Sequence, residues 1–263
     1  MRIVVKIGTS TVIRREDNSS VNIGLLDRLS KVLSDLRGAG HQIILVSSGA
    51  IAVGSIKLKL AERPTTLRMK QAAAAIGQLE LMHLYDKFFG EYGQSVAQIL
   101  LTDTDVDSLT RRAHLLNTFD ALLELGVIPI VNENDSVSAN EIETGDFRVL
   151  GDNDTLSAIV AALINADLLL LLSDVDALYD SDPHTNPKAV PFREVRGLAE
   201  LEKLRTVAGS AGTWGTGGMA TKLNAAQKAM ENGIAMYIQD GENVDKIYSM
   251  VSGEQTGTRF FPK

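Results

Sequence analysis

The stretch Ile3-Val4-Val5-Lys6-Ile7-Gly8-Thr9-Ser10 joins an apolar run to a glycine and two hydroxyl side chains. Its first five residues, mostly β-branched and without regular polar alternation, predict a strand that is buried on both faces. Similar runs predict five more strands, at Gln42–Val46, Ser95–Leu101, Val127–Val131, Leu168–Leu172 and Ala235–Ile238. Most of these runs lie next to stretches with helical period. The sequence therefore predicts an α/β fold in which helices cover both faces of a mainly parallel sheet.

The helical stretches have apolar residues three and four positions apart. One of them carries Leu25, Leu29, Val32, Leu33 and Leu36, and glycines follow it before the next strand. Three longer helices are predicted, at Met69–Phe89, Leu109–Leu125 and Asp154–Ala166. No Pro- or Ser-rich linker divides the chain, so we expect a single domain over residues 1–263.

The composition excludes several classes of site. The chain has no cysteine, which rules out disulfides, zinc–thiolate centres and thiol nucleophiles. A net charge of −7 without any basic run argues against nucleic acid as the main partner. The apolar run at the N-terminus is too short for a signal peptide, and Leu168–Leu172 is too short to span a bilayer. We expect a cytoplasmic protein that binds neither nucleic acid nor membrane.

Polar clusters stand at the ends of the predicted strands, where open α/β sheets bind their ligands. One such cluster is more often a turn or a helix cap than a site, but a series of five favours a site. The five clusters are Lys6-Ile7-Gly8-Thr9, Ser47-Ser48-Gly49-Ala50, Asn132-Glu133-Asn134-Asp135, Gly151-Asp152-Asn153-Asp154 and Ser173-Asp174.

A glycine-rich loop lies near the other end of the chain, at Gly215-Thr216-Gly217-Gly218-Met219-Ala220-Thr221-Lys222, with a helix predicted from about Leu223 to Asn232. Glycines let backbone N–H groups surround phosphate oxygens, and the lysine and the helix N-terminus add positive charge. The loop lacks the Gly-Lys-Ser/Thr end of a Walker A motif. Together with Lys6, Lys222 predicts a phosphoryl donor that is held between the two ends of the chain.

Two clusters can be assigned a structural or a functional role. Ser48 is suited to cap a helix, and the N–H groups of Ser48, Gly49 and Ala50 are equally suited to hold a phosphate or a carboxylate. Asp152, Asn153 and Asp154 can also cap a helix. One cap needs one side chain, however, so the surplus predicts ligand or lysine partners.

These residues fit phosphoryl transfer, which depends on positioning and on neutralisation of charge. Lys6 and Lys222 would offset the charge of the transferred group, and Asp154 would hold both ammonium groups. Mg²⁺ would be bound through the phosphates of the donor, with no direct protein ligand. A carboxylate acceptor is already an anion and needs no general base, which agrees with the lack of an obvious histidine base.

Taken together, the clusters resemble the amino acid kinase family, and within it the members that phosphorylate glutamate. The matching stretches follow family order over nearly the whole chain: 4–10, 46–54, 131–135, 151–158, 171–174, 178–179, 182–183 and 215–222. The resemblance implies an open, mainly parallel αβα sandwich of the carbamate kinase-like type. The N-terminal part would mainly bind the amino acid, and the C-terminal part would mainly bind ATP.

The implied reaction is transfer of the γ-phosphoryl group of MgATP to the side-chain carboxylate of L-glutamate, the first step of proline biosynthesis. The resemblance makes Lys6, Lys222 and Asp154 catalytic, and it assigns glutamate binding to Ser48, Asp135 and Asn153. The residues implied to bind ATP are Lys6, Gly8, Ser173, Asp174, Thr216, Gly217, Gly218, Met219, Ala220, Thr221 and Lys222.

The resemblance also implies a feedback inhibitor and protein partners. We expect inhibition by proline, a homo-oligomer (dimer or tetramer) formed through the helical region after Gly54, and a glutamyl phosphate reductase as pathway partner. We expect no C-terminal PUA domain, and we place the loop 142–150 near the substrate. Two alternatives stay open: a kinase of this fold with another acceptor, and a non-catalytic nucleotide or amino acid sensor, which would be expected to lack a lysine or Asp154.

Overall fold

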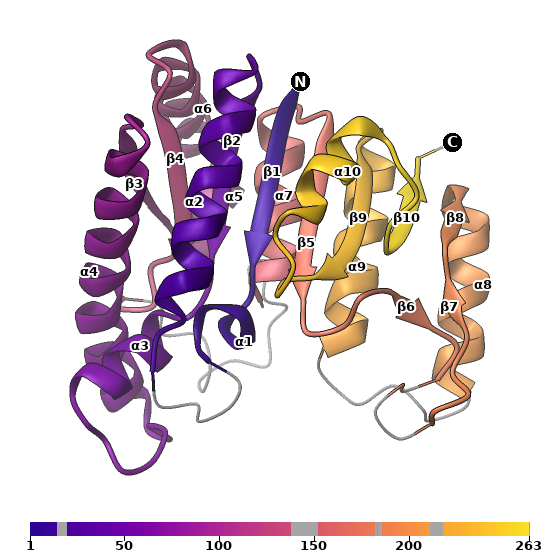
Figure 1. Ribbon diagram of the computed structural model, residues 1–263, viewed down its shortest axis with the longest axis horizontal. Coiled ribbons are helices and arrows are strands. Elements are labelled where there is room, and N and C mark those ends of the chain that lie inside the picture. The colour runs from indigo at the N-terminus through magenta and orange to yellow at the C-terminus, as the bar shows by residue number, and fades with distance from the viewer. Residues whose placement is uncertain (15–19, 138–151, 182, 184–185, 211–217, 263) are drawn as a thin grey trace.

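The computed structural model describes residues 1–14, 20–137, 152–181, 183, 186–210 and 218–262. An open eight-stranded sheet runs through this part of the chain (Figure 1). The strand order is β3-β4-β2-β1-β5-β9-β10-β8. Their bounds are β1 Arg2–Ile7, β2 Gln42–Ser47, β3 Val96–Leu101, β4 Ile128–Glu133, β5 Leu168–Ser173, β8 Glu194–Arg196, β9 Ala235–Asp240 and β10 Thr258–Phe261. All six strands predicted from the sequence are confirmed.

The central strand β1 is the point where the strand order reverses. It pairs in parallel with β2 on one side and with β5 on the other. On one side of β1 the chain forms β2, then the edge strand β3, and then β4, which lies between β2 and β3. It continues on the other side of β1 with β5 and β9. Only the pairing of β10 with β9 is antiparallel among the strands of this sheet. Ligands of such sheets bind beyond the carboxyl ends of the strands at the reversal, which here is the end of β1.

Helices cover both faces of the sheet, as predicted (Figure 1). One core contains buried residues of α2 (Ile23–Gly38), α3 (Ala50–Lys57), α4 (Leu67–Glu91) and α10 (Lys246–Ser252). The other contains residues of α6 (Leu109–Glu124), α7 (Asn153–Leu163), α8 (Gly197–Ser210) and α9 (Gly218–Glu231). Two short helices, α1 (Thr9–Val12) and α5 (Asp103–Asp107), complete the described set. No described helix has both the length and the apolar composition to cross a bilayer.

The two-residue period of β1 decides which way Lys6 points. Ile3, Val5 and Ile7 belong to the core beneath α2, whereas Val4 belongs to the core beneath α7. Since side chains two residues apart share a face of a strand, Lys6 lies on the same side as Val4 and faces α7. Lys6 therefore lies near the carboxyl end of β1, at the end of the sheet where α7 and α9 begin.

The structure corrects the predicted start of the last long helix. The sequence placed this start at about Leu223, but α9 already begins at Gly218. Lys222 is therefore a helical residue and not the end of a loop. Two small strands, β6 (Leu178–Tyr179) and β7 (Pro191–Phe192), form a separate antiparallel pair that was not predicted, because runs of two residues carry no detectable period.

Helices α3 and α4 cross at a pair of glycines. A Cβ added to Gly54 would stand 1.8 Å from the carbonyl oxygen of Ala73, and one added to Gly77 would stand 1.8 Å from the carbonyl oxygen of Ala50. Both approaches are impossible for real atoms, so the two backbones touch only because neither residue has a side chain. Ala50 is the first residue of α3, and the contact therefore fixes the start of this helix.

We predict that Gly77→Ala forces the two helices apart and lowers the free energy of unfolding by at least about 2 kcal/mol, as overpacking does. Gly90→Ala on the same helix is the matched control, because an added Cβ there meets nothing within 4 Å. The control should be neutral or stabilising by up to about 1 kcal/mol, because alanine favours the helix. Urea denaturation of both variants measures the effect. Equal stability of the two variants would contradict the close contact.

Candidate active site

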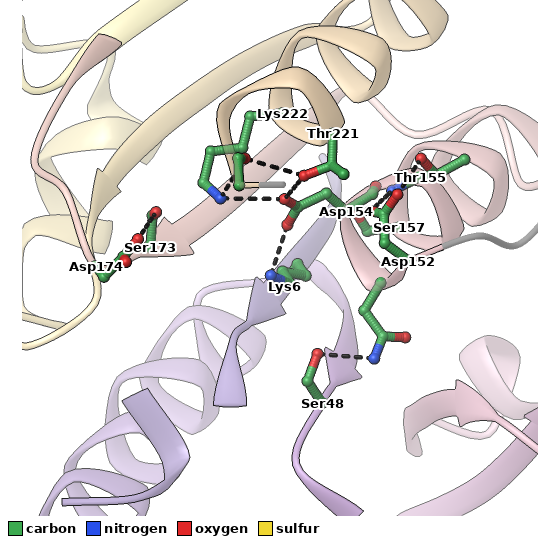
Figure 2. A network of polar contacts seen from close by, with 12 residues as sticks. Lys6, Ser48, Asp152, Asp154, Thr155, Ser157, Ser173, Asp174, Thr221 and Lys222 are labelled. Atoms are coloured by element: carbon green, nitrogen blue, oxygen red, sulfur yellow. Dashed lines mark hydrogen bonds and ion pairs between the residues drawn. The ribbon is translucent and has the colours of Figure 1, made fainter. Parts of the chain in front are cut away.

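A carboxylate and two ammonium groups meet beyond the end of β1 (Figure 2). The Nζ atom of Lys6 lies 2.5 Å from Oδ1 of Asp154, and the Nζ atom of Lys222 lies 3.2 Å from Oδ2 of the same residue. The hydroxyl of Thr221 donates to Oδ2 at 2.9 Å. The three residues that the sequence predicted to be catalytic are thus in direct contact.

Three separate elements supply this cluster, and each has a local reason for its position. Lys6 stands one residue before the end of β1, on the face that looks toward α7. Asp154 lies in the first turn of α7, where the positive end of the helix favours a carboxylate. Lys222 lies one turn into α9, and its side chain points back toward the start of that helix, where Nζ donates to the carbonyl oxygen of Gly218 at 3.0 Å.

The cluster is buried and carries a net positive charge. The side chains of Lys6 and Lys222 are each 9% exposed and that of Asp154 is 6% exposed. Burial by itself would raise the pKa of Asp154, but the attraction of Lys6 and Lys222 outweighs it and holds this pKa below its ordinary value. The carboxylate is therefore ionised and neutralises one of the two ammonium groups. The remaining positive charge is a binding site for an anion.

The run Asp152-Asn153-Asp154 divides its side chains among three tasks, as the surplus of polar groups predicted. Asp152 caps α7 by accepting from the backbone N–H and the hydroxyl of Thr155 at 2.8 and 2.9 Å. The Nδ2 group of Asn153 donates to the hydroxyl of Ser48 at 2.7 Å. Asp154 holds the two lysines.

A cavity of about 330 Å³ opens on one side of the cluster. Its lining includes all three residues that were predicted to bind glutamate, together with members of the cluster: Lys6, Ser48, Asp135, Asn153 and Asp154. The side-chain oxygen Oδ1 of Asn153 is buried and has no hydrogen-bond partner in the described part of the chain. A volume of this order suits a small polar molecule.

The first turn of α3 forms the floor of this cavity. The residue that caps α3 is Gly49 and not Ser48, which corrects the structural role suggested by the sequence. Gly49 has a φ of +104°, which is a left-handed conformation that glycine adopts readily, and a Cβ there would lie 3.3 Å from a methyl group of Val12. The hydroxyl of Ser48 is then left to face Asn153 and the cavity.

Two of the residues predicted to bind ATP, Ser173 and Asp174, lie on the other side of the cluster in Figure 2, where the lysines separate them from Ser48. Ser173 ends β5 and donates through its hydroxyl to Oδ1 of Asp174 at 2.9 Å. Gly8 follows β1 next to the ammonium group of Lys6. Met219, Ala220 and Thr221 lie in the first turn of α9. Thr216, Gly217 and the loop 142–150 fall outside the described residues.

One residue of the site, Thr221, was given a different role from the sequence, and another, Arg63, was not predicted. Thr221 was expected to bind ATP, and its hydroxyl also fixes the orientation of the Asp154 carboxylate. Arg63 lines the same cavity as Asp135, although it comes from the connection between α3 and α4 and follows no strand. A dipeptide Arg-Pro in a polar connection carries no motif, so the sequence offered no signal for it. Among the described residues, no group of three His, Cys, Asp or Glu side chains is arranged to hold a metal ion.

Curated relatives match the whole chain. Glutamate 5-kinase of Clostridium perfringens is 50% identical over 263 residues, which cover 100% of this chain and 96% of the relative. Glutamate 5-kinase of Listeria monocytogenes is 50% identical over the same length and is covered to 93%. Glutamate 5-kinase of Clostridium acetobutylicum is 49% identical and is covered to 95%.

Solved structures support the fold. Carbamate kinase from Giardia lamblia bound to AMP-PNP superposes with a TM-score of 0.69 at 16% identity, with 99% of this chain and 98% of that chain covered. Isopentenyl phosphate kinase from T. acidophilum, in a product complex, gives a TM-score of 0.63 at 16% identity, with 99% and 100% covered. The sequence model described as the amino acid kinase family matches residues 1–240. With this match, the full-length relatives and the carboxylate shared by two lysines at the end of β1, the chain belongs to the amino acid kinase family.

Proposed function

We propose that this chain transfers the γ-phosphoryl group of MgATP to the side-chain carboxylate of L-glutamate, which gives L-glutamyl 5-phosphate and starts proline biosynthesis. Relatives named glutamate 5-kinase match the whole of this chain at about 50% sequence identity, which supports this reaction. The observation on which the proposal rests is the buried, net positive cluster of Lys6, Asp154 and Lys222 between two groups of polar residues.

The cluster suits a transferring phosphoryl group. In the transition state, negative charge spreads over the three oxygens of the phosphoryl group that is being transferred. Ammonium groups that are already fixed in a dry site stabilise this charge without having to reorganise. Asp154 keeps both lysines fixed through one carboxylate, and the hydroxyl of Thr221 holds that carboxylate in turn. A sensor that only binds its ligands would need neither lysine in this position.

The cavity beside Lys6 suits an amino acid acceptor. A side-chain carboxylate of glutamate is ionised at neutral pH and can attack phosphorus without a general base. Asp135 offers a carboxylate for the α-ammonium group, and the unpartnered side-chain oxygen Oδ1 of Asn153 offers a second acceptor. The side chain of Asn153 donates to the hydroxyl of Ser48 and so positions it just before the start of α3. We assign glutamate binding to these three residues.

The opposite side of the cluster suits the nucleotide. The start of α9 presents N–H groups and the positive end of the helix, which are favourable partners for phosphate oxygens. We assign ATP binding to Gly8, Ser173, Asp174 and the segment 216–222, with Lys6 and Lys222 at the γ-phosphate. Mg²⁺ would be held by the ATP phosphates and supplies further neutralisation of their charge.

We also propose a cytoplasmic location, where glutamate and ATP are available, and three partners. Proline would act as a feedback inhibitor, the chain would form a dimer or tetramer through the region around α4, and a glutamyl phosphate reductase would consume the unstable acyl phosphate. Added proline should inhibit the reaction, sedimentation equilibrium should show a dimer or tetramer, and a coupled assay should show that a reductase consumes the product. A failure of any one of these assays would refute the proposal that it tests.

Trapping with hydroxylamine tests the reaction, because hydroxylamine converts an acyl phosphate into a stable hydroxamate. We expect hydroxamate to form with MgATP and L-glutamate and not with L-aspartate, N-acetyl-L-glutamate or no acceptor. Hydroxamate formed with one of the other acids would show that this acid, and not L-glutamate alone, is an acceptor. A folded protein that binds ATP and yields no hydroxamate with any of them would refute the proposed reaction.

Lys6→Met and Lys222→Met test the phosphoryl site. Each substitution keeps most of the side-chain volume and removes an ammonium group, so kcat should fall by about a hundredfold or more, with a smaller change in KM for either substrate. Lys228→Met on the same α9 helix is the matched control and should keep normal kcat, because Lys228 does not reach the cluster. Near-normal kcat in either active-site variant would contradict the proposed role of that lysine.

Asp154→Asn tests the charge balance through the pH dependence of stability. Since the folded-state pKa of Asp154 is lowered, its ionised form adds stability above the unfolded value of about 3.9, and this contribution is lost as the pH falls below it. The variant should be less stable than the wild type by about 3 kcal/mol near neutral pH, because it leaves two buried ammonium groups without a counterion.

Below about pH 4 the difference should narrow, because Asp154 of the unfolded wild type then takes up a proton, whereas the folded state holds its carboxylate ionised to lower pH. Urea denaturation of both proteins from neutral to acidic pH measures this difference. A constant difference over the whole range would show that the carboxylate charge does not determine the stability of the cluster.

A further inference from the structure

The connection between α3 and α4 brings an arginine to the edge of the acceptor cavity. Arg63 lines the same cavity as Lys6, Asp135 and Asn153, although its neighbours in sequence belong to a polar segment outside the sheet. The residue is exposed, whereas Lys6 is 7% exposed and lies at the inner end of the cavity. In the described part of the chain Arg63 has no hydrogen bond or ion pair. Its guanidinium group is therefore available to a ligand.

The backbone on both sides of Arg63 is held by the two helices. After α3, the N–H groups of Lys59 and Leu60 donate to carbonyl oxygens of that helix at 2.9 and 3.0 Å. Before α4, the carbonyl oxygen of Thr66 accepts from its first turn. Pro64 directly follows Arg63 and restricts its backbone to extended conformations. These constraints keep the arginine at the rim of the cavity.

The charges that line the cavity leave one part of an amino acid substrate without a partner. Three carboxylates line it, from Asp135, Asp152 and Asp154, and its cations are Lys6 and Arg63. Lys6 is engaged with Asp154 at the inner end, where the reacting carboxylate must meet the phosphoryl group. An α-ammonium group can bind Asp135. The α-carboxylate lies at the opposite end of the acid from the reacting group, where a cation at the outer end of the cavity would bind it favourably.

We propose that Arg63 binds the α-carboxylate of the acceptor amino acid and thereby selects for an acid with a free α-carboxylate. This inference rests on the proposed function, since it concerns the acceptor of that reaction. A guanidinium group matches a carboxylate with two parallel N–H donors, which fixes the orientation as well as the position of the acid. With the outer end held at Arg63, the side-chain carboxylate points inward to Lys6.

The surroundings give the arginine room for this role. Arg63 also lines a larger neighbouring cavity of about 860 Å³, which lies beneath the same connection and shares Thr9 and Ala52 with the acceptor cavity. The side chain thus stands at the border of two open spaces and is not packed in place. Binding of a carboxylate would order it on the side of the acceptor cavity, and the contact is expected to depend on the charge of that carboxylate.

The test compares two ligands on three variants by calorimetric binding. L-Glutamate carries the α-carboxylate, and L-isoglutamine replaces it with a neutral amide while keeping the ammonium group and the side-chain carboxylate. Arg63→Met should weaken L-glutamate binding by about tenfold to a hundredfold and L-isoglutamine binding by less than about threefold. Arg63→Lys should recover part of the loss. Arg68→Met replaces an exposed arginine of α4 that does not line the cavity, and it should change neither affinity.

Equal losses for the two ligands, or no loss for L-glutamate, would overturn the role of Arg63. Kinetics then separate this inference from the proposed reaction. Arg63→Met should raise KM for L-glutamate while KM for MgATP stays unchanged. If the wild type binds L-glutamate in an Arg63-dependent way but forms no acyl phosphate, the reaction is refuted and the binding role stands. If it forms the acyl phosphate and the variant is unchanged, only the role of Arg63 is refuted.

Discussion

The contact on which the site depends is a single carboxylate shared by two lysines in a dry environment. Two ammonium groups buried side by side would repel one another strongly, and Asp154 makes their proximity tolerable by lying between them. The attraction of Lys6 and Lys222 keeps Asp154 ionised, and the hydroxyl of Thr221 helps to orient its carboxylate. The carboxylate compensates only half of the positive charge. The cluster is therefore stable enough to persist and still favours an anion.

The topology of the sheet explains how residues so far apart in the chain form this contact. Lys6 lies on the strand where the strand order reverses, so elements from the first and second halves of the chain meet at its end. The first half contributes α3 and Asp135, which follows β4, to the acceptor cavity, and the second half contributes α7, β5 and α9 to the site. The glycine pair between α3 and α4 sets the start of α3 and the connection that carries Arg63.

Much of this arrangement was predictable from the sequence, because the buried strands are long apolar runs and the polar clusters directly follow them. The contact of Lys6, Asp154 and Lys222 was predicted from the requirements of phosphoryl transfer, and the structure shows it. The start of α9 was placed too late, because residues 215–222 were interpreted as a glycine-rich phosphate loop, whereas the helix already begins at Gly218. Arg63 could not be predicted, because its place in the site depends on the tertiary path of a connection without regular structure.

A crystal structure with MgADP, aluminium fluoride and L-glutamate would test the central claim most directly, because aluminium fluoride imitates a phosphoryl group in transfer. The account predicts that the fluoride ligands lie within hydrogen-bond distance of the ammonium groups of both Lys6 and Lys222, while Asp154 still contacts both. A complex in which either lysine points away from the fluoride, or in which Asp154 binds Mg²⁺ and releases the lysines, would contradict it.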